Sequence, residues 1–275
     1  DKDKIIETVK LIAPCFGGIN LEDIESPKCF EVENALQDIG IPVMHDDQHG
    51  TAIAVVAGII NSFKVTKREW ADSRIIVNGA GAAGLAIAKL IMAMGDVNPK
   101  YKIRECLVCD THGAIYQGRE DMNRWKDMVG IITNPYKKRL TMKEALKDAD
   151  VFIGVSAPNV INADDVSTMA KEPIIFALCN PNPEISVEEA KKGGALIVGT
   201  ARSDFPNQIN NLLAFPGIFR GALDAKAAKI THKMKVAAAL AIASCVKNQT
   251  PEMVVPDPLD KKIAKTVAKA VMKVA

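Results

Sequence analysis

A glycine-rich turn between two apolar runs constrains the fold of this chain more than any other feature of its sequence. Residues 74–90 read RIIVNGAGAAGLAIAKL, a strand-like run and a helix-like run separated by the pattern GxGxxG. In such a turn the first glycine allows a tight turn, the second lets the backbone approach a pyrophosphate, and the third lets helix and strand pack closely. The sequence therefore predicts a dinucleotide-binding loop. Its residues are Gly79, Ala80, Gly81, Ala82, Ala83 and Gly84.

The next strand-like run ends in an acid that bears on the choice of nucleotide. Asp110 closes the run ECLVCD and lies 31 residues after Gly79, whereas roughly 20 is usual; a polar inserted connection accounts for the excess. A carboxylate there can accept hydrogen bonds from both ribose hydroxyls of the adenosine, which favours NAD over NADP. Thr111 and His112 follow, with no arginine immediately placed to take a 2′-phosphate. The alternative is that Asp110 is an ordinary surface acid.

Short β-type runs alternate with helical patterns along most of the chain, which is typical of βαβ units. The expected strands are residues 41–44, 74–78, 105–109, 151–155, 174–178 and 195–198. The expected helices are residues 27–38, 48–64, 82–95, 120–128, 142–148, 163–170 and 186–192, and residues 1–14 also have a helical pattern. Because the strands are continuous apolar runs, both faces of the sheet should be covered. The predicted fold class is α/β, a Rossmann-type doubly wound, mostly parallel sheet with additional carboxyl-terminal helices.

The composition changes from about residue 217, where alanine-rich helical segments begin. Residues 221–247 and 259–274 have this character, and the proline-punctuated stretch TPEMVVPDP lies between them. We expect three parts. Residues 1–45 carry part of a metal site and pack with the carboxyl-terminal helices, residues 46–211 form the dinucleotide-binding Rossmann domain, and residues 212–275 form a helical carboxyl-terminal segment.

Acidic pairs follow two apolar runs in the first fifth of the chain. Glu22 and Asp23 follow one run, and Asp46 and Asp47 of HDDQHG follow another. Four carboxylates at one edge of a sheet would repel one another strongly without a cation, and hard oxygen ligands suit Mg²⁺ or Mn²⁺. The two histidines of HDDQHG have a zinc-like spacing but straddle the predicted strand-to-helix turn, so zinc is a weaker alternative. A further alternative is that these acids merely start helices.

Composition argues against several other classes of function. The formal net charge is +2, from 35 basic and 33 acidic residues, and aromatic residues make up 5% of the chain, so we expect no nucleic-acid partner. No long apolar run is free of charge, so we expect no membrane span. The six cysteines lie in apolar runs, and Cys106 and Cys109 form a CxxC inside a predicted buried strand rather than at a helix start. Reduced thiols of this kind indicate a cytoplasmic protein.

Five ordered motifs resemble the malic enzymes, most closely their small prokaryotic-type branch. The motifs are NLEDI, the DD-x-x-G-T-A block, GAGAAG, FALCNP and FPNQINNLLAFPG, and together they span essentially the whole chain. Enzymes of this family oxidise L-malate with NAD(P)⁺ and a divalent metal, and they decarboxylate the bound oxaloacetate to pyruvate. The resemblance therefore implies NAD with NADP as the alternative, Mg²⁺ or Mn²⁺, malate and pyruvate as substrate and product, and a homodimer.

The resemblance also implies roles for individual positions. The carboxylates that match the family's metal site are Glu22, Asp23 and Asp47, with Asp46 as the supporting neighbour. Residues 79–84 match the pyrophosphate loop. The asparagines that match positions near the nicotinamide and the substrate carboxylate are Asn180 of FALCNP and Asn211 of QINNL, with Asn210 beside the latter.

One part of the family's site has no match in this sequence. The resemblance implies a lysine base and a tyrosine acid from motifs that precede NLEDI, and none of the 21 residues before Glu22 matches them. We therefore expect the chain to be a fragment with little or no turnover alone. Two alternatives stay open: a noncatalytic module that binds NAD or a dicarboxylate, and a metal-dependent oxaloacetate decarboxylase.

Overall fold

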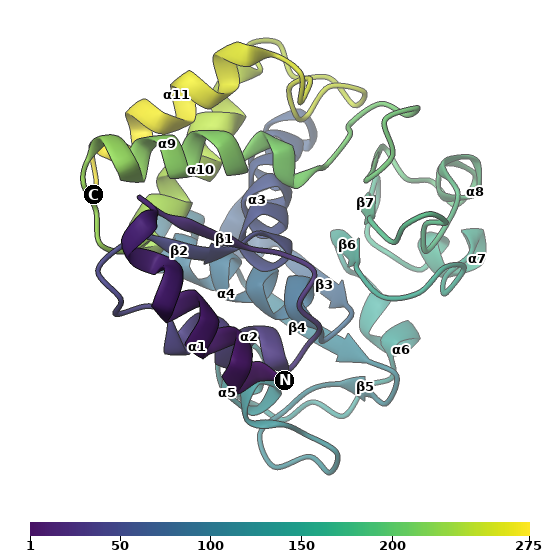
Figure 1. Cartoon of the computed structure of the whole chain (residues 1–275). Helices are drawn as coiled ribbons and strands as arrows, with labels where there is room; N and C mark the ends of the chain where they lie inside the picture. Colours follow the sequence, from purple (N-terminus) through teal and green to yellow (C-terminus); the bar gives the residue numbers. More distant parts are fainter.

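The central element of the fold is a six-stranded sheet with strand order β5-β4-β3-β6-β7-β8. The computed structural model describes residues 1–275 and is drawn in Figure 1. All neighbouring strands are parallel except β5, which runs antiparallel to β4. The strands are β3 (Arg74–Asn78), β4 (Glu105–Asp110), β5 (Gly113–Ala114), β6 (Val151–Gly154), β7 (Ile174–Ala177) and β8 (Ile197–Thr200). The predicted Rossmann-type α/β class is confirmed.

A second, two-stranded sheet lies apart from the first. Strands β1 (Ile19–Leu21) and β2 (Val43–His45) are parallel, with Leu21 opposite His45. The two strands therefore end at the same edge, directly before the acidic pairs of the sequence. Strand β2 was predicted at residues 41–44, and β1 was not among the expected strands, because a three-residue run that includes Asn20 has no alternation to detect.

Eleven α-helices surround the two sheets. They are α1 (Lys2–Ile12), α2 (Lys28–Ala35), α3 (Asp46–Thr66), α4 (Ala82–Val97), α5 (Arg124–Thr133), α6 (Met142–Leu146), α7 (Ala163–Ser167), α8 (Val187–Lys192), α9 (Phe215–Asp224), α10 (His232–Cys245) and α11 (Lys261–Met272). Helix α5 begins later than residues 120–128 predict, because the Asn123 side chain caps it by accepting from the backbone N–H groups of Trp125 and Lys126. The helical run 221–247 is interrupted, and Thr231 caps the start of α10.

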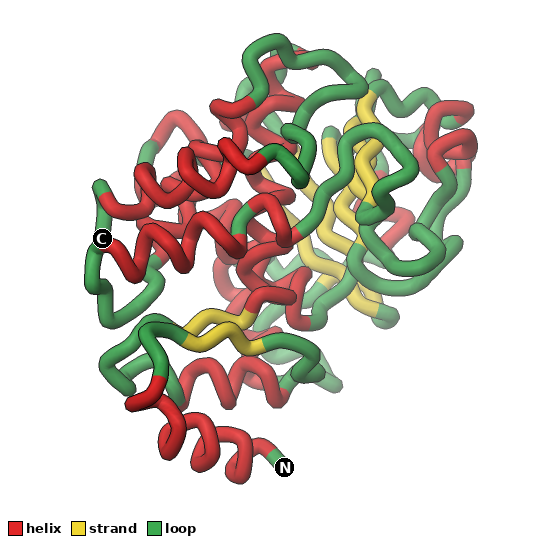
Figure 2. The backbone as a smooth tube through the Cα atoms, turned by 45° about the horizontal axis from the view of Figure 1, so that its top comes forward, coloured by secondary structure: helices red, strands yellow, loops and turns green.

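Both faces of the large sheet are buried, as the continuous apolar strands predict. Ile75 and Val77 of β3 point into a core of 53 buried residues that includes much of α3, α4 and α10. Ile76, between them, points to the opposite face, into a core of 17 residues under α6, α7 and α8. Figure 2 shows the yellow strands between these two groups of red helices. The strand ends are consequently the part of the sheet that remains open to a ligand.

The two cysteines of the CxxC pair lie in a buried strand, as predicted. Cys106 and Cys109 are buried in β4, and all six cysteines are free thiols. Burial raises the pKa of both thiols to about 12, so neither is a reactive thiolate at neutral pH. None of the helices combines the length and apolar character that a bilayer-spanning helix needs.

Helix α3 connects the large sheet to the carboxyl-terminal helices, which pack beside it in Figure 1. Its residue Asn61 is fully buried, and the amide nitrogen donates to the carbonyl oxygens of Ala243 at 3.0 Å and Val254 at 2.9 Å. These bonds tie α3 both to α10 and to the proline-rich connection after it. The three-part division of the chain stays a prediction, since these contacts describe packing and not independent folding.

Replacing Asn61 by alanine should lower the free energy of unfolding by about 2 kcal/mol, because two buried carbonyl groups would lose their donor. The neighbouring Ser62→Ala is the matched control, since the Ser62 hydroxyl is buried and has no hydrogen-bond partner. Urea titration of both variants measures the difference. Equal losses in the two variants would contradict the role of the Asn61 amide.

Candidate functional site

The three glycines of the predicted dinucleotide loop each meet a different steric requirement. Gly79 has φ +124°, and a Cβ atom there would lie 2.5 Å from the carbonyl oxygen of Val155. A Cβ atom at Gly84 would lie 1.7 Å from the carbonyl oxygen of Gly79, so helix α4 can approach β3 only without a side chain. Around Gly81 a Cβ atom would meet nothing within 4 Å. The backbone at Gly81 is therefore open to a ligand, as expected for a loop that approaches a pyrophosphate.

Helix α4 begins immediately after this loop. Gly81 is its N-cap residue and provides no side-chain hydrogen bond to the first turn. The first N–H groups of an α-helix have no intrahelical partner, and together with the helix dipole they favour an anion. Beside the loop, the Asn78 amide donates to the Ser156 hydroxyl at 2.9 Å and joins the carboxyl ends of β3 and β6.

Asp110 lies at the carboxyl end of β4, as predicted, but it is not a free carboxylate. It accepts hydrogen bonds from the side chains of Arg119 and Lys126 and from the backbone N–H of His112. Burial raises the pKa of Asp110, but the Arg119 and Lys126 bonds outweigh burial and lower it to about 2. Arg119 was not predicted as a partner of Asp110, because it lies nine residues further along the chain and not beside the acid. A cation beside this acid could meet a 2′-phosphate.

The acid Asp46 lies in the first turn of α3 and is 4% exposed. One carboxylate oxygen accepts from the Asn211 amide at 2.7 Å, and the other is buried without a partner. Gly50 makes this arrangement possible, because a Cβ atom there would lie 2.0 Å from Asp46 Oδ1 and 2.8 Å from Asn211 Cβ. The structure thus joins the HDDQHG stretch to the asparagine motif, which lies 165 residues further along the chain.

The neighbouring acid Asp47 contacts the end of the other short strand. Its Oδ2 accepts from the backbone N–H of Asp23 at 2.9 Å, and Asp23 has φ 56°, in the left-handed region. Glu22 is exposed and accepts from the Asn20 amide at 3.1 Å. Burial, Glu22 and Asp47 together raise the pKa of Asp46 to about 7. The end of β1 and the start of α3 therefore lie close enough for Glu22 to affect Asp46 and for Asp23 to bind Asp47.

These acids do not form a closed set of metal ligands in the structure. No group of three or more His, Cys, Asp or Glu side chains is arranged to hold a metal ion. The residues that the resemblance implies as metal ligands therefore lie near one another, but their carboxylates are not arranged around a single ion position.

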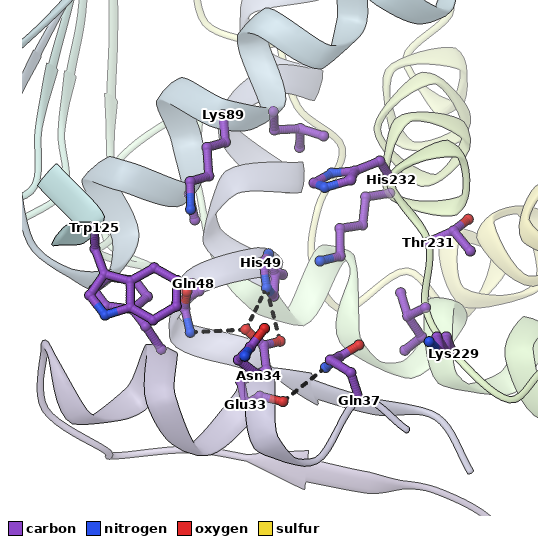
Figure 3. A pocket seen from close by; sticks show the side chains of 15 residues that line it. Glu33, Asn34, Gln37, Gln48, His49, Lys89, Trp125, Lys229, Thr231 and His232 are labelled. Atoms are coloured by element: carbon purple, nitrogen blue, oxygen red, sulfur yellow. Dashed lines mark hydrogen bonds and ion pairs between the residues drawn. The ribbon is translucent and has the colours of Figure 1, made fainter. Parts of the chain in front are cut away.

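The two histidines of HDDQHG lie on different sides of the start of α3. His45 ends β2 and is fully buried, and its Nε2 lies 3.6 Å from Asp47 Oδ2. His49 points away from Asp46 and Asp47, and its Nε2 contacts Glu33 of α2 at 2.9 Å, as Figure 3 shows. Burial lowers the pKa of His49 to about 4, so its ring is uncharged at neutral pH. The two rings therefore do not share a metal-ligand arrangement.

The three asparagines are placed differently. Only Asn211 contacts an acid of the candidate site. Asn210 caps a short 3-10 helix by accepting from the backbone N–H of Leu212 at 2.9 Å. Asn180 is exposed just after β7, in the loop that follows the strand. The structure thus brings one of the three predicted asparagines into the site by direct contact.

Comparisons with known proteins identify relatives across the whole chain. The family described as "Malic enzyme, NAD binding domain" matches residues 48–275. The bifunctional malic/malolactic enzyme of Bacillus subtilis is 52% identical over 100% of this chain and 66% of its own length. The NAD-dependent malic enzyme of Geobacillus stearothermophilus is 44% identical over 100% of this chain and 56% of its own length. This chain therefore spans less than two thirds of these curated relatives.

Solved structures agree with the sequence comparison. The NAD-dependent malic enzyme of Thermotoga maritima superposes with a TM-score of 0.92 at 41% identity. The superposition covers 99% of this chain and 71% of that one.

The glycine geometry predicts a large loss of stability for one substitution and almost no change for a similar one. Gly84→Ala should lower the free energy of unfolding by about 2 kcal/mol or more. The energetic cost of the clash with the Gly79 carbonyl should exceed the roughly 1 kcal/mol by which alanine stabilises a helix relative to glycine. Gly81→Ala should change the free energy of unfolding by less than about 0.5 kcal/mol, since its surroundings are open. Chemical denaturation distinguishes them. A Gly84→Ala variant as stable as Gly81→Ala would show that α4 does not need this close approach.

Proposed function

The chain belongs to the malic enzyme family, and we propose that it binds NAD and a divalent metal ion for the oxidative decarboxylation of L-malate to pyruvate and CO₂. The observation that carries this proposal is the contact between Asp46 and Asn211. It joins two of the family's motifs at a buried position, where an unpartnered carboxylate oxygen remains. A site that leaves a buried acceptor unsatisfied has a polar ligand as its simplest explanation.

The proposed metal ligands are Glu22, Asp23 and Asp47, with Asp46 beside them. All their donor atoms are carboxylate oxygens, which fit Mg²⁺ or Mn²⁺ better than zinc. Their mutual repulsion would be relieved by a cation. When bound, such an ion acts as a Lewis acid that stabilises negative charge developing on the oxygens of the substrate.

The chain's own residues would bind and orient the substrate. We propose that Asn211, with Asn210 and Asn180, orients the carboxylate of malate and the nicotinamide, which would contribute through proximity and alignment. Turnover also needs a proton acceptor and a proton donor. The contacts around Asp46, Asp47 and Asn211 involve no lysine or tyrosine. We therefore expect nucleotide and metal binding to be measurable in this chain even where turnover is low.

The nucleotide would lie across the open backbone at Gly81, with its pyrophosphate at the start of α4. The adenosine ribose would then approach Asp110. Arg119 and Lys126 already bind that carboxylate, so two modes of nucleotide recognition are open. Asp110 could bind the ribose hydroxyls of NAD, or Arg119 could bind the 2′-phosphate of NADP. We propose NAD, since the partly buried Asp110 can accept from the ribose on an oxygen bonded to only one backbone N–H.

Replacing Asp110 by alanine should lower the affinity for NAD by about tenfold, which corresponds to the loss of one or two hydrogen bonds. Arg119→Ala should leave NAD affinity within about twofold of the original. Calorimetric titration of each variant with NAD and with NADP measures both. If Arg119→Ala weakens NADP binding while Asp110→Ala leaves NAD binding unchanged, the chain prefers NADP.

Replacing Asp47 by asparagine should weaken Mn²⁺ binding by about tenfold or more, because one charged ligand is lost. The exposed Asp96 lies outside the proposed site, and Asp96→Asn is the matched control with the same loss of charge. Paramagnetic relaxation of water by Mn²⁺ reports the affinity without requiring turnover. Equal Mn²⁺ affinity in the two variants would remove Asp47 from the metal site.

A further inference from the structure

A polar cavity lies beside the start of α3, where Gln48 and His49 line it. Its volume is about 370 Å³, within the range of small-molecule sites, and none of the residues assigned to the proposed metal and nucleotide sites lines it. Figure 3 shows side chains from α2, α3, α4 and α5 facing those from the start of α10. The cavity is therefore distinct from the proposed catalytic site.

One lysine of this cavity lacks a partner. Lys235 of α10 is only 8% exposed, and it lines the cavity. Its ammonium group forms no hydrogen bond or ion pair with the protein, although buried charges are normally paired. Burial lowers the pKa of Lys235 to about 8, with Lys89 as a further cause, while Glu33 opposes the shift. The lysine is thus a buried donor directed at a space that the protein leaves open.

Two other nitrogen-bearing side chains face the same space. Lys89 of α4 lies 5.6 Å from the centroid of the Trp125 ring and has a pKa lowered by burial. His232 has a pKa lowered by burial and by the charges of Lys235 and Lys89. Lys89 therefore disfavours the positive charge of Lys235, and both lysines disfavour that of His232. An anion between the three groups would reverse this effect.

The only carboxylate that lines the cavity, that of Glu33, is already hydrogen-bonded to other donors. Glu33 accepts from the His49 ring, from the Gln48 amide at 3.2 Å and from the backbone N–H of His45 at 3.1 Å. These bonds hold Glu33 against the start of α3, beyond ion-pair distance of Lys235. It therefore cannot take the place of a ligand anion.

The cavity also has an apolar wall. The Phe30 and Trp125 rings pack with their centroids 5.2 Å apart, and both line the cavity. A ligand that carries an apolar body as well as an anionic group could contact both kinds of surface.

We propose that this cavity binds a small organic anion, whose carboxylate or phosphate meets Lys235, Lys89 and His232 and whose apolar part lies against Phe30 and Trp125. The proposal goes beyond the malate chemistry and does not depend on it. A ligand here would contact Gln48 and His49, which directly follow Asp46 and Asp47 in α3, so the cavity is placed to influence the proposed metal site.

The test uses phenyl phosphate and phthalate as organic probes and inorganic phosphate as the probe without an apolar body. Each is titrated calorimetrically into the whole chain without divalent metal or nucleotide, at constant ionic strength. We expect at least one organic probe to bind with a submillimolar Kd, and the preferred probe tells phosphate from carboxylate recognition. Trp125→Ala should weaken the organic probe and leave inorganic phosphate unchanged.

Lys235→Met should weaken the preferred probe by about tenfold or more, whereas Lys233→Met should leave its affinity unchanged. Lys233 is exposed in the same helix and does not line the cavity, so it controls for the loss of one charge. Thermal unfolding checks that each variant is folded, and Lys89→Met repeats the test from α4 if Lys235→Met is not. Absence of binding by every probe, or equal losses in the cavity variants and Lys233→Met, would overturn the proposal.

Discussion

The burial of helix α3 is the constraint on which both polar regions of this protein depend. Along most of its length the helix is packed between the large sheet and the carboxyl-terminal helices. Its first turn therefore cannot move independently, and the polar side chains there have fixed directions. Asp46 and Asp47 point towards Asn211 and Asp23, whereas Gln48 and His49 point towards Glu33. The first turn of α3 therefore lies between the acidic region around Asp46 and the basic cavity around Lys235.

The two regions present the same electrostatic problem with opposite signs. At Asp46, burial and the nearby carboxylates of Glu22 and Asp47 raise the pKa of the carboxyl group. On the other side, Lys89 lowers the pKa of Lys235, and both lysines lower the pKa of His232. Such concentrations of like charge oppose folding unless a ligand of opposite charge binds, and they are typical of functional sites for that reason. A bound cation near Asp46 and a bound anion near Lys235 would each reduce the repulsion between like charges that the folded protein otherwise retains.

Local sequence was sufficient where a structural feature depends on neighbouring residues. The strands β3, β6 and β7 are short apolar runs, and their existence and approximate bounds follow from that pattern. The glycine turn was equally predictable, because Gly79 and Gly84 are required by close contacts within the strand–turn–helix unit or with the segment that follows β6. The short strand β1 was not predictable, since three residues carry no period and the strand exists only through its pairing with β2.

The Rossmann-type sheet, the glycine loop, the acid at the end of β4 and the family resemblance all follow from the order of residues along the chain. Which distant side chains meet depends on how the elements pack. The tertiary structure places Asn211 on Asp46, Arg119 and Lys126 on Asp110, and Lys235 in a cavity without a partner. The physical reason is that periodicity records which face of an element is buried, whereas the charge and hydrogen bonding of a polar group depend on neighbours that chain folding brings from elsewhere.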